Sequence, residues 1–321
     1  MNLKNALKIF ISLILIYFLI KYNSLDLSVI TKLDFIILIK LFILFIFILI
    51  FGSLKWYFIL KVQNKNINYK ETFEAYYIGY ALNYYLFGVA GDLIKTFFIA
   101  KKRSNKTGIV LSVLLDRFLG MICMLVIILF FIPNVFKESV ILKEFFVNYT
   151  TFYYIFLCST IFLFLYFFYK FLNSRRINKL LTYNTKNKII LILIKILNTF
   201  LFYKSSYLNI LINMIFSIVI QFVIALSLFL ISLSILNEDL SFVSHILSSV
   251  SVQVLTILPI SPGNIGVSEV AFAQLMQIMN ENKFLPFASV YFIYRIFSML
   301  VSIPGFFIYY IYLRRDAKNE K

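Results

Sequence analysis

Four ionisable residues lie in strongly apolar surroundings: Asp92, Arg117, Glu269 and Arg295. Each carboxylate follows glycines closely, and an arginine comes 25 residues after the first carboxylate and 26 residues after the second. A charge at the centre of a bilayer costs about 2.5–3.5 kcal/mol on insertion scales, so such residues mark a functional site or a structural ion pair. Carboxylates beside guanidinium groups suit two kinds of chemistry, anion recognition and proton transfer.

The sequence leaves three roles open for these residues. In the first, the helix N-termini that follow the glycines and the two guanidinium groups form a cradle for a lipid phosphate. In the second, the carboxylates offset the dipoles of their own helices and pair with Arg117 and Arg295 to fix one helix to the next. In the third, one of the carboxylates carries a coupling proton.

Three further polar residues are candidates near these four. Lys95 lies one turn after Asp92, where it contacts an anion or acts as an i,i+3 partner of that carboxylate. Asn83 and Gln221 lie in apolar segments, where hydrogen bonding between helices is the alternative to substrate contact.

Other buried or half-buried groups have simpler expected roles. Asp116 is rotated by about 100° from Arg117 on a helix, so we expect it to face another partner. Lys40 and Lys55 lie near span ends and are expected to snorkel. His245, the only histidine, is expected near the outer surface, and the sequence indicates no metal site and no cofactor.

Composition places the chain in a membrane. Hydrophobic residues make up 62% of 321 residues and charged residues 14%, and the mean hydropathy is +0.91. Soluble domains are nearer half apolar and a quarter charged. The net charge of +17 is spread through short loops, which favours an anionic membrane surface as partner and excludes a nucleic-acid-binding face.

Apolar runs and loop charges predict an all-α polytopic protein that forms one integral membrane domain over residues 1–321. Six spans are expected, at 6–22, 35–60, 109–132, 151–172, 208–236 and 287–313. The most basic loop covers 170–206, and the positive-inside rule puts it and both termini in the cytoplasm, with the protein in the cytoplasmic (inner) membrane.

Two segments begin and end on one side of the membrane by this charge rule, 72–100 from the cytoplasm and 243–280 from outside. Each has helix breakers in its middle, which are Gly88 and Gly91 in the first and Pro259, Pro262, Gly263 and Gly266 in the second. We expect two re-entrant hairpins, because broken backbone at membrane depth needs protein or a water-filled cavity around it. Two short transmembrane helices per segment are the alternative.

The two broken segments also define an internal repeat. Residues 35–132 and 208–313 each contain a span, a broken hairpin with a carboxylate after the glycines, and a span with an arginine. The loop charges place the units in opposite orientations, an architecture typical of secondary transporters. Chance similarity is the alternative.

These residues resemble the flippase-like family built on the transmembrane region of lysylphosphatidylglycerol synthases. The carriers are "GDLIKTFFIAKK…LSVLLDRFLG" and "LPISPGNIGVSEVAF…YRI". The positions that match the family pattern are Asn83, Gly91, Asp92, Asp116, Arg117, Pro262, Gly263, Gly266, Glu269 and Arg295. Phe87, Lys95 and Asn264 depart from it, and Lys95 in place of arginine puts a bidentate anion contact there in doubt.

The resemblance implies an integral membrane protein that moves a lipid or helps to modify it. We expect a lipid translocase without the synthase domain of bifunctional relatives, acting on a phospholipid or a polyprenyl-phosphate-type lipid. An enzyme or accessory protein of lipid-linked glycan assembly, with Asp92 or Glu269 as general base, is the alternative. No sequence feature indicates whether the protein is a monomer or an oligomer.

Overall fold

The computed structural model describes residues 25–85, 90–101, 103, 105–136, 206–236, 238–257, 260–280 and 285–319, with scattered positions between 14 and 21 and between 151 and 203. Most of the predicted spans 6–22 and 151–172 and of the basic loop 170–206 lies outside the described residues, as do Gly88 and Pro259. The described residues form helices and no strand.

Four long helices form the frame of the protein. They are α2 (Phe35–Gln63), α5 (Lys106–Phe136), α9 (Tyr207–Leu236) and α12 (Phe287–Asn319). All four are long and apolar enough to cross a bilayer. They coincide with four of the six predicted spans, which confirms a multi-pass helical membrane protein.

Short helices occupy the two segments that contain helix-breaking residues and in which hairpins were predicted. The first segment contains α3 (Tyr69–Tyr85) and α4 (Ala90–Ala100), and the second contains α10 (Phe242–Leu255) and α11 (Val267–Met279). Between α10 and α11 lies the 3-10 turn η2 (Pro262–Asn264), and a second such turn, η1 (Leu27–Lys32), precedes α2. The short helices have 17, 11, 14 and 13 residues, so only α3 approaches the length of a full crossing.

The break before α11 has a backbone that requires its residue types. Gly263, Asn264 and Gly266 have φ angles of 54°, 55° and 85°. Side chains other than glycine and asparagine rarely adopt this left-handed region. The conformation also explains why asparagine at 264 can stand where the family pattern has glycine.

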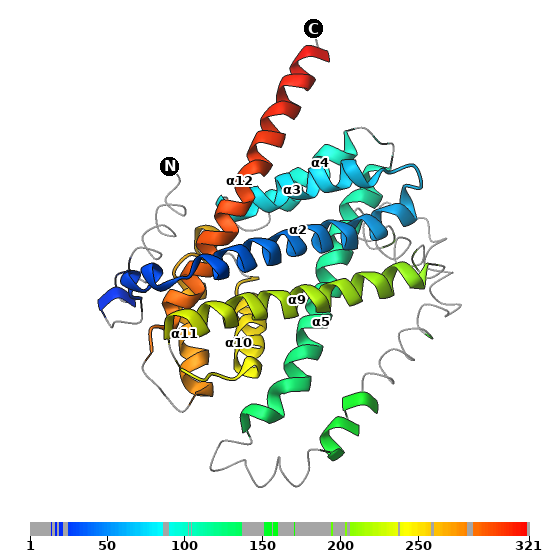
Figure 1. The fold of residues 1–321 in the computed structure, drawn as a ribbon. Coiled ribbons are helices and arrows are strands. Elements are labelled where there is room, and N and C mark those ends of the chain that lie inside the picture. Colours follow the sequence, from blue (N-terminus) through cyan, green and yellow to red (C-terminus); the bar gives the residue numbers. More distant parts are fainter. Residues whose placement is uncertain are drawn as a thin grey trace.

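The helices pack in corresponding pairs. α2 and α9 lie side by side and run in opposite directions (Figure 1). α2 contacts α3 as α9 contacts α10, α4 contacts α5 as α11 contacts α12, and α12 contacts α3 as α5 contacts α10. Helices α2, α3, α4 and α5 form one set, and α9, α10, α11 and α12 form the other. The contacts within one set correspond to those within the other, and the contacts between the two sets also come in corresponding pairs.

Apolar side chains lie both inside the bundle and on its outer faces. Leu41, Phe45 and Trp56 of α2 are fully buried, whereas Phe35 and Phe42 of the same helix are exposed. A water-facing helix would have polar residues on its outer side. The exposed apolar faces fit contact with lipid.

Candidate functional site

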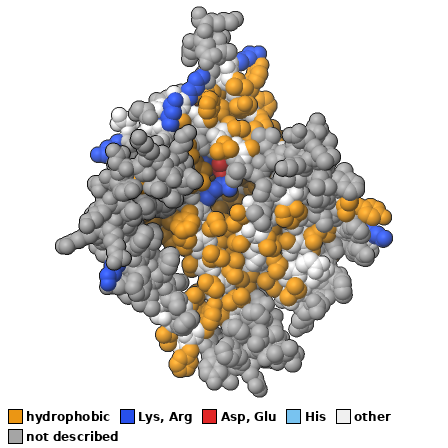
Figure 2. All heavy atoms as spheres, turned by 180° about the vertical axis from the view of Figure 1, so that it is seen from behind, with side chains coloured by type: hydrophobic (Ala, Val, Ile, Leu, Met, Phe, Trp, Pro, Cys, Tyr) orange, Lys and Arg blue, Asp and Glu red, His pale blue; other side chains and the backbone are white. Residues whose placement is uncertain are grey.

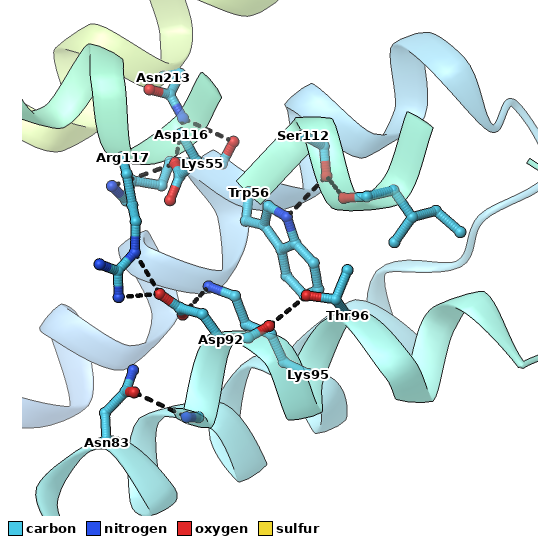
Figure 3. A network of polar contacts seen from close by, with 12 residues as sticks. Lys55, Trp56, Asn83, Asp92, Lys95, Thr96, Ser112, Asp116, Arg117 and Asn213 are labelled. Atoms are coloured by element: carbon cyan, nitrogen blue, oxygen red, sulfur yellow. Dashed lines mark hydrogen bonds and ion pairs between the residues drawn. The ribbon is translucent and has the colours of Figure 1, made fainter. Parts of the chain in front are cut away.

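Asp92 is the centre of the first charge cluster (Figure 3). It is the third residue of α4 and is buried, with 7% of its surface exposed. Lys95 Nζ lies 2.7 Å from its Oδ1, and Arg117 Nε of α5 donates to its Oδ2 at 2.5 Å, with Nη2 on the same oxygen. One carboxylate is thus shared by two cations and fixes α4 to α5.

The start of α4 packs directly on α3. The Gly91 N–H donates to Asn83 Oδ1 of α3 at 3.1 Å, so one of the free amides at this helix N-terminus has a partner. A Cβ atom added at Gly91 would overlap the Gly79 carbonyl oxygen and lie 2.6 Å from Asn83 Oδ1. Gly91 therefore permits the close approach of two helix backbones.

Replacing Gly91 with alanine is expected to lower the thermal stability of the purified protein, because overpacking of this kind costs about 1–3 kcal/mol. The matched control is Gly120→Ala in α5, where the added Cβ would meet only Lys55 Nζ at 3.9 Å. That change should be neutral or stabilising by about 0.5–1 kcal/mol, since alanine favours the helix. Equal melting temperatures for the two variants would contradict the close packing of α3 and α4.

Lys95 points away from solvent into an aromatic slot. Its Nζ lies 4.7 Å from the ring centroid of Trp56 and 5.2 Å from that of Tyr76, and the residue is 4% exposed. Both rings supply cation–π attraction in addition to the ion pair with Asp92. Lys95 thus forms the i,i+3 ion pair with Asp92 that its position predicted. Its ammonium group is buried and is not among the groups that line the pockets described below.

A second network joins three long helices through Asp116. Lys55 Nζ of α2 lies 3.2 Å from Asp116 Oδ1, and Asn213 Nδ2 of α9 donates to the same oxygen at 2.7 Å (Figure 3). The predicted separate partner of Asp116 is therefore confirmed, whereas the snorkelling prediction for Lys55 is wrong. α2 continues to Gln63, so Lys55 lies about two turns inside the helix and turns inward to a carboxylate.

Glu269 forms the corresponding cluster in the second set of helices. It is the third residue of α11, and its Oε2 accepts from the N-cap Gly266 N–H at 2.7 Å. Its Oε1 lies 2.6 Å from Arg295 Nε of α12. Asp92 and Glu269 thus each lie in the first turn of a short helix and pair with the arginine of the next long helix. This is the second of the three roles that the sequence left open, in which the ion pairs fix one helix to the next.

The two arginines differ in how much of each guanidinium is available. Arg295 Nη1 donates to the Gly263 carbonyl at 2.5 Å and Nη2 to the Asn264 carbonyl at 3.2 Å, so all three nitrogens are engaged. Its side chain is 7% exposed, against 39% for Arg117. Arg117 Nη1 has no partner among the described residues. Arg117 is therefore open to a ligand, whereas Arg295 braces the loop before α11.

A central cavity in two adjoining lobes lies between the broken segments. The Arg117 lobe has a volume of about 310 Å³ and is lined by Tyr80, Asn83, Tyr84, Arg117, Thr256, Ile257, Gly263 and Asn264. The Tyr291 lobe, about 270 Å³, is lined by side chains that include Tyr76, Gln253, Ser268, Tyr291, Tyr294 and Arg295. The lobes share Tyr80, Tyr84, Thr256, Gly263 and Asn264. On the face of the molecule drawn in Figure 2, a few basic and acidic side chains lie close together and are surrounded by apolar ones.

The cavity brings together only part of the predicted set. Asn83, Arg117, Gly263 and Arg295 line it, whereas Gly91, Asp92, Lys95, Gly266 and Glu269 are not among its lining residues. Gly263 is also the point at which the two broken segments meet, because a Cβ there would lie 2.7 Å from the Tyr84 carbonyl oxygen.

Tyrosines are the lining residues that motif reasoning missed. Tyr76, Tyr80 and Tyr84 recur every four residues along α3 and form one face, and the hydroxyls of Tyr80 and Tyr84 lie 3.3 Å apart. Tyr291 and Tyr294 of α12 complete the aromatic wall. The spacing of four was visible in the sequence, but 22 tyrosines in the chain hide it.

Two other polar residues have structural partners. Gln221 of α9 and Gln253 of α10 exchange hydrogen bonds at 3.2 and 2.7 Å, which confirms the interhelical role expected for Gln221. His245 lies near the start of α10 and is fully buried against its neighbours, and its Nε2 lies 2.7 Å from Ser232 Oγ.

Comparison with known proteins assigns the chain to a family. No curated protein and no solved structure matched it. The family model described as the lysylphosphatidylglycerol synthase TM region matches residues 5–305, which include both broken segments and both arginines. This protein is a member of the lysylphosphatidylglycerol synthase TM region family, a membrane family of lipid-related function.

Proposed function

We propose that the protein is a translocase that moves a phosphate-bearing lipid across the cytoplasmic membrane. The observation that carries the proposal is the central cavity, a polar space inside an apolar helix bundle with the half-exposed Arg117 in its wall. A lipid headgroup that crosses a bilayer needs a polar path, because an unpaired charge in hydrocarbon is costly.

The arrangement of the helices supports this function. We interpret α2–α5 and α9–α12 as two units of an inverted-topology repeat, covering 35–132 and 208–313, with α3–α4 and α10–α11 as hairpins that enter from opposite faces. The corresponding contacts of the two sets and the parallel placement of Asp92 and Glu269 are what such a repeat requires. In transporters of this type the substrate site lies at the repeat interface, and the residues that line the cavity come from both of the proposed units.

The sidedness of this repeat can be measured with a membrane-impermeant thiol reagent. In a chain whose Cys123 and Cys158 are replaced by serine, we expect Lys65→Cys and Asn105→Cys to react from the cytoplasmic side and Asp239→Cys from the outside. These positions flank the two broken segments, and the positive-inside rule sets their sides. Reaction of positions 65 and 105 from opposite sides would contradict two hairpins in an inverted repeat.

Arg117 is the group that we assign to the phosphate. Its planar guanidinium presents paired N–H donors that match two phosphate oxygens. When Arg117 turns to a substrate, Asp92 keeps Lys95 at 2.7 Å, so the carboxylate is not left unpaired. The shared carboxylate thus lets the arginine exchange partners at low cost.

The function is tested by reconstitution into vesicles that contain a phospholipid labelled on its acyl chain. We expect the protein to make inner-leaflet label accessible to a membrane-impermeant quencher at a rate well above that of protein-free vesicles. Arg103→Gln should keep this activity, because Arg103 pairs with Glu71 at 2.7 Å outside the cavity. A rate equal to that of empty vesicles, with folded protein present, would refute the translocase.

A further inference from the structure

We infer that Lys55, Asp116 and Asn213 form a latch that holds one end of the helix bundle closed. This end, where α2 finishes and α9 begins, is the inner end, and the loop charges place it in the cytoplasm. The outer end is where α2 begins and α9 finishes. The assignment of a latch rests on the proposed function, because a translocase built on an inverted repeat must open each end of its bundle in turn.

Asn213 is the part of the latch that belongs to the α9–α12 set. It lies about two turns after the start of α9, and it is 0% exposed. Its Nδ2 donates to Asp116 Oδ1 of α5 at 2.7 Å (Figure 3) and to the Lys55 carbonyl oxygen of α2 at 3.1 Å. A single amide group therefore ties α9 to two helices of the α2–α5 set.

The α2–α5 set supplies a charged acceptor for this amide. Lys55 Nζ lies 3.2 Å from the same Asp116 oxygen, and the two side chains are 14% and 6% exposed. A hydrogen bond to an ionised carboxylate is stronger than one between neutral groups, and more so where water is excluded. Because Lys55 and Asp116 belong to the same set, their ion pair persists when Asn213 moves away. The latch can therefore open without leaving a buried charge unpaired.

The corresponding contact in the outer half of the bundle is aromatic. Tyr294 precedes Arg295 in the sequence as Asp116 precedes Arg117. Tyr294 of α12 packs on Phe45 of α2, with ring centroids 5.1 Å apart, and both belong to the apolar cluster that fills the space between the outer halves of α2 and α9. The two ends of the bundle thus differ in what must break when they open, a polar tie at the inner end and apolar packing at the outer end.

Two buried polar atoms beside the latch have no hydrogen-bond partner in the described part of the structure. They are Asn213 Oδ1 and Ser217 Oγ, which lies one turn further along α9, on residues that are 0% and 3% exposed. A buried polar atom without a partner is unfavourable. Water that enters an opened inner end would satisfy both atoms. They therefore favour opening, and the latch opposes it.

Distances between spin labels at the inner end test the latch. The labels are attached to Lys61→Cys of α2 and Leu208→Cys of α9, both exposed positions, in the chain whose native cysteines are replaced by serine. We expect one short distance in this protein. Asn213→Leu removes the amide and keeps the ion pair of the α2–α5 set, so a second, longer distance should appear, with the ratio of open to closed protein raised at least about tenfold.

Two controls show whether the change is confined to the inner end. Gln221→Leu removes a buried amide from the same helix but breaks a contact within the α9–α12 set, so the inner distance should stay as it is. Labels at Ile36→Cys of α2 and Leu233→Cys of α9, which are exposed at the outer end, should not move apart in Asn213→Leu.

Reaction of Ser217→Cys with a membrane-impermeant thiol reagent gives a second readout. Ser217 is 3% exposed, so the cysteine should be protected while the latch is closed. In combination with Asn213→Leu it should react from the cytoplasmic side, because the inner end is then open to water.

An inner distance that is unchanged in Asn213→Leu would overturn the latch. The same lengthening in Gln221→Leu, or an equal lengthening at the outer end, would also overturn it, since the helices would then be loosened in general. If Asn213→Leu does not fold, Asp116→Asn, which removes the charge from the acceptor, is measured in the same way. A longer inner distance in folded protein that moves no lipid would refute the translocase and leave the latch, whereas lipid transport with an unchanged inner distance would do the reverse.

Discussion

Replacing Arg117 with glutamine is expected to reduce lipid transport to the rate of protein-free vesicles while leaving the protein folded. The guanidinium supplies the charge-assisted hydrogen bonds to the phosphate, each with a net contribution of about 1.5–3 kcal/mol. Loss of two such bonds corresponds to at least about a hundredfold decrease in transport. Folding should survive because Asp92 keeps its contact with Lys95 and because the Arg117 side chain is already 39% exposed.

The matched controls separate charge from geometry at this position. Arg103→Gln removes the same side chain from an ion pair outside the cavity and should leave the rate unchanged. Arg117→Lys keeps the charge but loses the paired donors, so it should retain an intermediate rate. Wild-type transport by Arg117→Gln would show that the phosphate binds elsewhere.

Replacing Glu269 with glutamine is expected to destabilise the protein strongly. Arg295 would keep its charge at 7% side-chain exposure without a counter-ion. Removal of one partner from a buried ion pair costs about 3–5 kcal/mol. A lower melting temperature in detergent and a reduced yield of monodisperse protein measure this effect.

The same substitution at a less buried ion pair is the control. Glu71→Gln breaks the ion pair with Arg103. The side chain of Glu71 is 32% exposed and that of Arg103 is 25% exposed, so the change should lower the free energy of unfolding by only about 0–1 kcal/mol. Glu269→Gln combined with Arg295→Gln should recover part of the loss, because neither partner is then charged. If Glu269→Gln melts like Glu71→Gln, the Glu269–Arg295 pair does not brace α11 against α12.

Much of the fold could be predicted from the sequence because its signals are local. Apolar runs defined the four long helices, and Gly91, Gly263 and Gly266 lie close to the starts of α4 and α11. The two carboxylate–arginine pairings also followed from local features, namely a charge in the first turn of a helix and an arginine inside the next span.

The division of roles between the arginines could not be predicted in this way. It depends on the loop before α11, whose Gly263 and Asn264 carbonyls turn toward Arg295 and occupy its donors. Lys55 was misplaced for a related reason, since its inward direction is set by Asp116, which lies on a different helix. Such contacts are fixed by tertiary packing and leave no periodic signal.

Mass spectrometry of the lipid that copurifies with the protein tests the central claim most directly. The cavity with Arg117 in its wall predicts that one phosphate-bearing lipid is enriched over its share in the membrane extract. The enrichment should persist in Arg103→Gln and be lost in Arg117→Gln. Equal enrichment of that lipid in Arg117→Gln, or the bulk lipid composition in all three proteins, would contradict a phosphate site at Arg117.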